Sequence, residues 1–356
     1  MHVLQPIFIT LVLAYSQIKG VLGIPGSAAP LVISSSGGWD GPDGPWSSFD
    51  LGAGSNIQAF RGFPALSQSL YILPHQTSWC GGTDQIEICE RRGSYQAGDS
   101  TSWKEAGVYD LGDDLSPFTL SGYPPIAYLG LDTIIWGKTS IDPQFERQWI
   151  AQIVSEDFPM ALIGLGTGVY HLPNGTDGGD VTSPIVGLRE NGTIPSITYG
   201  YNAGSFYRNQ TASLILGGYD SARIKNLSAS ASFSMPSNQN TTLIAKISSV
   251  GLNTNLSGNP TELDTPFLAR IESAVPQFYL PLNICHAFEE AFGLTWDSTL
   301  LYYTVNESSH KINIQRNSSV TFSIGENDQV TKLTFPYQAF DLQLSYPLIK
   351  EVNTSI

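Results

Sequence analysis

Two short segments far apart in the chain share a pattern that could position acid–base chemistry. In each segment one distinctive residue is followed seven residues later by a tyrosine: Pro64 precedes Tyr71, and Glu272 precedes Tyr279. The segments read Phe63-Pro64-Ala65-Leu66-Ser67 and Ile271-Glu272-Ser273-Ala274-Val275. A carboxyl group such as that of Glu272 can act as a general acid or base, whereas Pro64 has neither a carboxyl group nor an amide proton. The matched spacing indicates two related halves of the chain.

Further motifs surround these two segments in a fixed order. They are Trp39-Asp40-Gly41-Pro42-Asp43-Gly44-Pro45-Trp46-Ser47, Phe60-Arg61, Ala161-Leu162-Ile163-Gly164-Leu165-Gly166, Ile194-Pro195-Ser196, Ser213-Leu214-Ile215-Leu216-Gly217-Gly218-Tyr219-Asp220 and Ala287-Phe288-Glu289-Glu290-Ala291-Phe292-Gly293-Leu294. In this order the motifs resemble the pepsin-like aspartic peptidase family, and within it a fungal secreted group, over most of residues 31–346. The resemblance implies two β-rich lobes that flank a deep cleft, with a flap from the first lobe that closes over an extended peptide.

The same resemblance assigns the two catalytic aspartate positions of the family to Pro64 and Glu272. Enzymes of this kind use two carboxyl groups about 3 Å apart that share one proton, so that one activates water and the other acts as the acid. The first carboxyl is lost at Pro64, and no Asp occurs between Asp50 and Asp84. At the second position, the extra methylene of Glu272 moves the carboxyl oxygens by more than about 1 Å. We therefore expect a protein without peptidase activity that binds an extended peptide or protein ligand and uses no cofactor.

Two other functions stay open from the sequence. In the first, the protein is an active aspartic endopeptidase in which Glu272 works with Asp50 or Asp84 as its partner. In the second, it is a structural cell-surface glycoprotein in which the cleft has no role. Hydrolysis of peptides at acid pH would distinguish the first from the expected inactive protein.

The expected fold is all-β and bilobal, with lobes at residues 31–188 and 189–356. Apolar and β-branched runs between turn signals predict strands at residues 69–73, 127–136, 161–165, 194–201, 213–216, 243–250, 311–314 and 320–324. Apolar residues at helical spacing predict helices at residues 145–154 and 284–292, and Gly293 is placed to end the second helix. Residues 37–48 are rich in Gly, Pro and Asp and predict a loop.

The second lobe is expected to lack its final strands. Gly164, in the strand that completes the first site in the family, follows Pro64 by 100 residues. The same offset from Glu272 falls beyond Ile356, the last residue. We expect the flap within residues 95–130, where the family's usual Tyr-Gly-x-Gly sequence does not occur.

The N-terminus and the charge indicate a secreted protein. Residues 7–15 are apolar apart from Thr10, which predicts a signal peptide at residues 1–23. The formal net charge of -14 argues against a nucleic acid or an anionic membrane surface as partner, because either would need a basic face. No later segment approaches the roughly 20 apolar residues of a membrane span. We expect a secreted, extracellular monomer, with cell-surface association in the structural alternative.

Sequons and cysteines fit an oxidising, glycosylating compartment. Nine Asn-x-Ser/Thr sequons predict glycosylation, at Asn174, Asn191, Asn209, Asn226, Asn240, Asn255, Asn306, Asn317 and Asn353. Cys80 and Cys89 bracket a loop short enough to close as a disulfide. Cys285 is left over, either as a buried thiol on a helix or as a thiol whose partner this sequence does not contain. No cluster of residues predicts a metal site.

Overall fold

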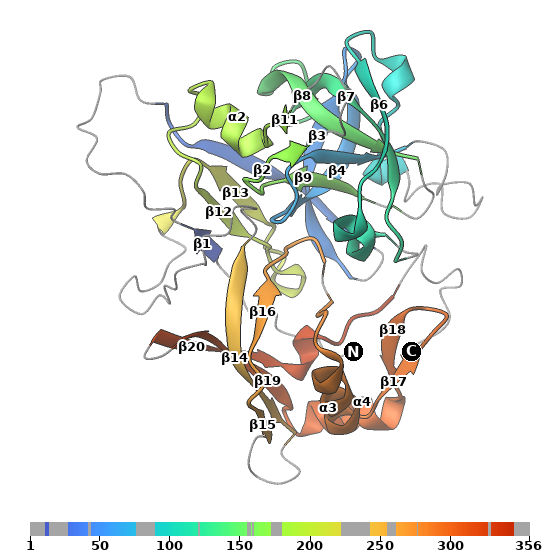
Figure 1. Cartoon of the computed structure of the whole chain (residues 1–356), viewed down its shortest axis with the longest axis vertical. Coiled ribbons are helices and arrows are strands. Elements are labelled where there is room, and N and C mark those ends of the chain that lie inside the picture. The colour runs from blue at the N-terminus through green and yellow to red at the C-terminus, as the bar shows by residue number, and fades with distance from the viewer. Residues whose placement is uncertain are drawn as a thin grey trace.

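The computed structural model describes residues 11–13, 28–41, 44–75, 90–119, 122–154, 158, 160–171, 180–221, 243–254, 261–275, 277–326 and 329–344. The protein is mainly β, with 45% strand and 17% helix in one large mixed sheet and smaller antiparallel sheets. Figure 1 shows the large sheet in the upper half of the molecule and a second sheet with two helices in the lower half. The expectation of a β-rich protein is therefore confirmed.

The largest sheet has 11 strands and contains the first of the two matched segments. In spatial order the strands are β1 (Leu11–Leu13), β12 (Tyr199–Asn202), β13 (Ser213–Leu216), β2 (Leu31–Asp40), β3 (Trp46–Ala53), β4 (Gln58–Ala65), β9 (Ala161–Gly164), β5 (Tyr71–Pro74), β8 (Gln144–Ile153), β7 (Ile126–Ile135) and β6 (Lys104–Asp110). β3 also pairs with β7, so the strands from β3 to β7 in this order form a closed ring. Closure of this kind removes exposed strand edges.

The strand that carries Pro64 is fixed by β9. β4 and β9 run parallel, with Pro64 opposite Ile163 and Ala65 opposite Gly164, while β5 pairs with β9 in the antiparallel direction. A Cβ atom on Gly164 would lie 2.4 Å from the carbonyl oxygen of Leu70, so this close approach of two backbones requires glycine. The strand predicted at residues 161–165 is confirmed as β9, and its register places it beside Pro64.

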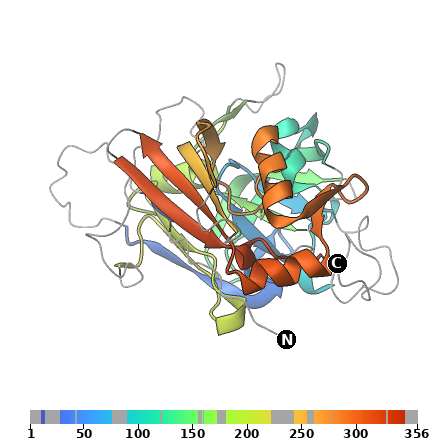
Figure 2. The ribbon, with the colours of Figure 1, turned by 90° about the horizontal axis from the view of Figure 1, so that it is seen from below.

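The second sheet is antiparallel and carries the helices of the C-terminal half. Its strands are β15 (Thr261–Leu263), β14 (Ile244–Asn253), β19 (Ser319–Glu326) and β20 (Gln329–Pro336), and β16 (Phe267–Arg270) also pairs with β14. Beside it lie α3 (Leu282–Phe292), α4 (Glu307–Gln315) and the hairpin of β17 (Leu294–Asp297) and β18 (Tyr302–Val305), as Figures 1 and 2 show. The short elements are β10 (Tyr170–His171), β11 (Asp180–Val181), α2 (Pro184–Glu190), η1 (Ala97–Asp99), η2 (Asp113–Phe118), η3 (Phe206–Arg208) and η6 (Tyr337–Ala339).

The loop predicted at residues 37–48 was wrong for most of this range, which belongs to the paired strands β2 and β3. β2 extends to Asp40 and β3 begins at Trp46, and their pairing shifts register between Ser35 and Trp39. Gly37 has φ +74, a backbone conformation that favours glycine, and it lies within this irregular stretch. The glycines that suggested a loop therefore mark an irregularity inside a strand.

Two further predictions of secondary structure were wrong. The helix predicted at residues 145–154 is β8, an interior strand that pairs with β5 on one side and β7 on the other. Its last four residues are all buried, and a strand covered on both faces has the continuous apolar run that can imitate helical spacing. The strand predicted at residues 311–314 belongs to α4, where the Asn306 side chain caps the first turn by accepting a hydrogen bond from Ser309 N.

The prediction of α3 and of its end is confirmed. The helix ends at Phe292, and Gly293 adopts the left-handed conformation with φ 68 that commonly follows a helix. A Cβ atom at Gly293 would lie 2.5 Å from Ser309 Oγ, so the position excludes larger residues for a second reason. Within the described ranges, no helix is long and apolar enough to cross a membrane.

The residues around Glu272 connect separate parts of the core. Ile271 packs against the buried cluster that includes Phe49 and Tyr71 in the large sheet, and also against the cluster of the second sheet. Ala274 packs against a further cluster of the large sheet. The segment from Ile271 to Ala274 therefore packs against both sheets through the apolar side chains at its two ends. We call this segment and the turn after β4 the joint.

Candidate functional site

The two matched segments meet at this joint. Pro64 is buried in β4, and its carbonyl oxygen accepts a hydrogen bond from the Ser273 hydroxyl, although 209 residues separate the two in the sequence. The turn after β4 brings Leu66 and Ser67 against the side chain of Glu272. The structure thus brings together the two positions that the sequence singled out.

The Glu272 carboxylate accepts five hydrogen bonds, from both segments. Leu66 N donates to Oε1 at 2.9 Å, and Ser67 donates to Oε2 through its backbone N–H at 2.9 Å and its hydroxyl at 2.5 Å. From its own segment, Ser273 N and Ala274 N donate to Oε1 at 2.7 and 3.0 Å. An ionised carboxylate offers about four lone-pair positions, so these donors occupy its accepting capacity.

This hydrogen-bonding pattern differs from that of an acid–base pair of carboxyls. Every hydrogen bond between Glu272 and a described residue is donated to its carboxylate by an N–H or O–H group. A catalytic pair instead needs a second carboxyl that shares a proton, and space for a water molecule that one of them activates. In the described structure, N–H and O–H donors from Leu66, Ser67, Ser273 and Ala274 occupy the Glu272 carboxylate oxygens.

The two acids weighed as partners for Glu272 do not meet it in the described structure. Asp50 lies in β3, where its carboxylate contacts Lys138 Nζ at 2.9 Å and Arg61 Nε at 3.7 Å. Asp84 lies outside the described residues. Asp50 therefore pairs with basic side chains in the described structure.

Two buried tyrosines lie close enough to Glu272 to sense its charge. Burial raises the pKa of Tyr199 and of Tyr201, and the negative charge of Glu272 adds to both increases. These residues belong to β12, which pairs with β1 and β13 in the large sheet. Their hydroxyl groups therefore stay neutral at ordinary pH.

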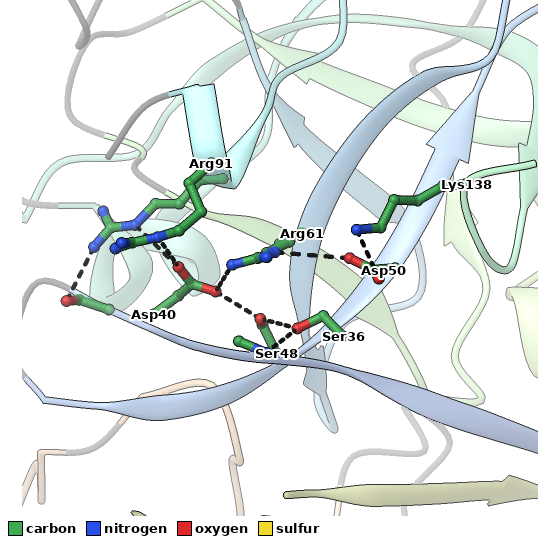
Figure 3. A network of polar contacts seen from close by, with 10 residues as sticks. Ser36, Asp40, Ser48, Asp50, Arg61, Arg91 and Lys138 are labelled. Atoms are coloured by element: carbon green, nitrogen blue, oxygen red, sulfur yellow. Dashed lines mark hydrogen bonds and ion pairs between the residues drawn. The ribbon is translucent and has the colours of Figure 1, made fainter. Parts of the chain in front are cut away.

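A second polar cluster, around Asp40, was missed in the sequence. The Asp40 side chain is fully buried, and it accepts a hydrogen bond from Ser48 Oγ at 2.6 Å. The guanidinium groups of Arg61, Arg91 and Arg92 lie 3.3, 3.5 and 3.9 Å from its carboxylate oxygens. Figure 3 shows Arg61 and Arg91 reaching Asp40 from different parts of the chain. The signal was present in Trp39-Asp40-Gly41, but the assignment of this stretch to a loop hid it.

The Asp40 cluster continues to Asp50 through Arg61. Arg61 lies between the two carboxylates, and Lys138 reaches Asp50 from the far side (Figure 3). On the Asp40 side, Ser48 is also hydrogen-bonded to Ser36 at 2.8 Å. Two acidic and four basic side chains are linked by these contacts, which join β2, β3 and β4.

Exposed apolar residues lie on one face of the β6–β7 hairpin. Val108 is opposite Tyr128 in the pairing, and Ile126 lies two residues before Tyr128, so the three side chains share a face. All three are exposed, by 53% at Val108, 49% at Ile126 and 39% at Tyr128. We call these three residues the hairpin face. Exposed apolar groups gathered on one surface are typical of a binding region.

The hairpin of β17 and β18 carries two exposed apolar side chains, Leu301 and Trp296, of which Leu301 lies near the segment that leads into β7. A Cβ atom on Gly122 would lie 3.5 Å from Leu301 Cδ1, so Leu301 approaches the segment just before Ile126. Trp296 is 48% exposed and packs edge to face on Tyr303 with a centroid distance of 5.1 Å. Leu301 and Trp296, which we call the tip pair, therefore come from the C-terminal half.

The remaining predicted site residues are placed as follows. Cys80 and Cys89 lie outside the described residues, as do the sequons at Asn174, Asn226, Asn240, Asn255 and Asn353. The described sequons have exposed asparagines, at Asn191, Asn209, Asn306 and Asn317. Cys285 is a half-buried free thiol on α3 that donates to the Leu280 carbonyl at 3.4 Å, and burial raises its pKa. In the described part of the chain, no three His, Cys, Asp or Glu residues gather as a metal site.

No known protein-family model matches the chain, and no curated protein matches it in sequence. The resemblance to the pepsin-like family therefore rests on the ordered motifs of the sequence.

Proposed function

We propose that this protein is a secreted, glycosylated member of the pepsin-like group that has no peptidase activity and binds an extended peptide. The proposed loss of activity rests on the hydrogen bonds that the Glu272 carboxylate accepts. Its carboxylate accepts five hydrogen bonds from Leu66, Ser67, Ser273 and Ala274, and its counterpart position is Pro64. A carboxylate that is saturated by donors and lacks a partner acid can neither share a proton nor activate water.

The ligand part of the proposal is supported by the two exposed apolar surfaces. The hairpin face comes from the N-terminal half, and the tip pair comes from the C-terminal half. Gly122 and Leu301 bring the two regions near each other. An extended peptide with apolar or aromatic side chains could contact both at once, because alternate residues of an extended chain point to opposite sides.

Hydrolysis and binding are to be measured on the same purified full chain. Against a peptide library between about pH 2 and pH 7, we expect no hydrolysis above that of the Glu272→Gln variant. Cleavage at acid pH that pepstatin inhibits and that Glu272→Gln abolishes would instead establish the peptidase alternative. Asp50→Asn then tests whether Asp50 is the partner acid.

Peptide binding distinguishes the proposed function from a purely structural glycoprotein. We expect peptides rich in apolar and aromatic residues to bind, and Tyr128→Ser or Leu301→Ser to weaken that binding by about tenfold, as a well-packed contact residue does. Ile141→Ser is the matched control, because Ile141 is 92% exposed in the turn between β7 and β8. Binding that is absent, or that changes equally in all three variants, would favour the structural alternative.

A further inference from the structure

Two of the five hydrogen-bond donors to Glu272 come from equivalent places in the two matched segments. Ala274 follows Glu272 by two residues and donates its N–H to that carboxylate. Leu66 follows Pro64 by two residues, and its N–H donates to the same carboxylate across the joint. By this symmetry, the N–H of Leu66 points to where a carboxylate on residue 64 would accept it. Pro64 leaves that donor without its local acceptor, and the longer side chain of Glu272 reaches it.

We propose that these donors form a binding site for a single carboxylate group, which the chain fills with its own Glu272 side chain. The ligand class is a monocarboxylate, because two oxygens receive separate sets of N–H and O–H donors. Oε1 takes Leu66, Ser273 and Ala274, and Oε2 takes both groups of Ser67. Filled in this way, the site locks the turn after β4 to the segment that begins at Ile271. This inference does not depend on the proposed peptide binding or on the loss of hydrolysis.

The site is fixed by contacts that do not involve the Glu272 side chain. The Ser273 hydroxyl is hydrogen-bonded to the Pro64 carbonyl. On the other side, Gly166 N donates to Gln68 O at 2.7 Å and holds the turn that carries Ser67. Ile271 and Ala274 pack into separate apolar clusters. Removal of the Glu272 carboxylate therefore leaves the donors in place and without an acceptor.

The test is rescue of Glu272→Ala by formate. Unfolding by denaturant is followed for the wild-type chain and the variant as formate replaces chloride at constant ionic strength, over about 1 to 100 mM. In chloride, we expect the variant's unfolding equilibrium constant to rise by roughly tenfold to hundredfold, since several donors to a charged acceptor lose their partner. Formate should reverse this loss in a saturable way. Wild type should show no such effect, because its site is already filled.

Two further variants identify the site that formate occupies. Ser67→Ala combined with Glu272→Ala removes one donor to the carboxylate and should weaken formate binding by about tenfold. Glu262→Ala is the matched control, because Glu262 accepts a hydrogen bond from Ser249 in the second sheet and is a single-donor carboxylate in the described structure. Formate should not restore the stability of that variant. Equal formate effects on wild type and Glu272→Ala, or no change on adding Ser67→Ala, would overturn the proposal.

A variant that unfolds still gives a decisive result. If Glu272→Ala is unfolded in chloride, folding upon addition of formate supports the carboxylate site. Glu272→Gln serves as the second variant, because the amide keeps the shape of the side chain and blocks formate while removing the charge. If Glu272→Gln folds and Glu272→Ala stays unfolded in saturating formate, the proposal is wrong.

Discussion

At the scale of single residues, one methylene group decides what the carboxyl at position 272 can do. The Glu272 side chain is long enough to accept hydrogen bonds from Leu66 and Ser67 on the opposite segment, as well as from Ser273 and Ala274 on its own. An aspartate would hold its oxygens about 1 Å or more closer to its own backbone. The length of the side chain therefore turns a residue typical of catalysis into one that joins two segments.

This argument gives a prediction for Glu272→Asp, the change that restores the acid of the resembled family. We expect the variant to be less stable by about 1–3 kcal/mol, because the donors of Leu66 and Ser67 lose their charged acceptor. We also expect it to hydrolyse no peptide, since position 64 is still Pro64. Denaturant unfolding measures the change, with Glu307→Asp on the exposed surface as control. Unchanged stability in Glu272→Asp would show that the bonds across the joint contribute little.

At the scale of elements, the buried Asp40 carboxylate fixes β2 against its neighbours. It contacts Ser48 of β3, Arg61 of β4, and two arginines that follow the undescribed residues 76–89. A buried charge is expensive to remove from water, and it is tolerated here because opposite charges and a hydroxyl surround it. Loss of one partner leaves the others uncompensated, so the cluster behaves as a unit.

We therefore predict that Asp40→Asn destabilises the fold by about 3–5 kcal/mol, the usual effect of removing one member of a buried ion pair. Asparagine keeps an oxygen that accepts the hydrogen bond from Ser48. The decrease in unfolding free energy therefore measures the loss of the negative charge at position 40. Asp50→Asn is the matched control in the same network, because Asp50 is more exposed and pairs with the half-exposed Lys138. That control should lose only about 1 kcal/mol or less. Equal losses in the two variants, measured by denaturant unfolding, would contradict the role given to Asp40.

At the scale of the whole molecule, buried tyrosines link stability to alkaline pH. Burial raises the pKa values of Tyr71, Tyr199 and Tyr201 above the ordinary value near 10. The unfolded chain therefore loses these protons first as pH rises, and it binds fewer protons than the folded chain above about pH 10. Their contribution to stability is complete below about pH 10 and falls as the pH rises further.

The prediction is a loss of about 1.4 kcal/mol per pH unit for each buried tyrosine above about pH 10. Unfolding free energies measured from about pH 8 to pH 11 give the slope. Tyr71→Phe should reduce that slope by one tyrosine's share, although it also removes the acceptor of the Trp136 Nε1 hydrogen bond at 3.1 Å. The test therefore compares the slope of unfolding free energy against pH, and not the free energy itself, between Tyr71→Phe and wild type. An unchanged slope would show that Tyr71 ionises in the folded state.

Elements were predictable where neighbouring residues carry the whole signal. α3 has both an apolar stripe and Gly293 at its end, and the structure confirms both. β8 was misread because its last four residues are all buried in a strand that lies between β5 and β7, and local spacing does not reveal what covers them. The Asp40 cluster was missed for a related reason: its partners come from separate elements.

Three conclusions could be drawn from the sequence alone: position 64 has no carboxyl group, position 272 keeps one, and strands dominate the chain. These are properties of side-chain type and local pattern, which do not depend on the arrangement of distant segments. Only the tertiary structure decided the role of Glu272, whose carboxylate meets the N–H of Leu66 across 206 residues of sequence. That hydrogen bond exists because the packing of two sheets sets the distance between the segments, and neither segment encodes that distance alone.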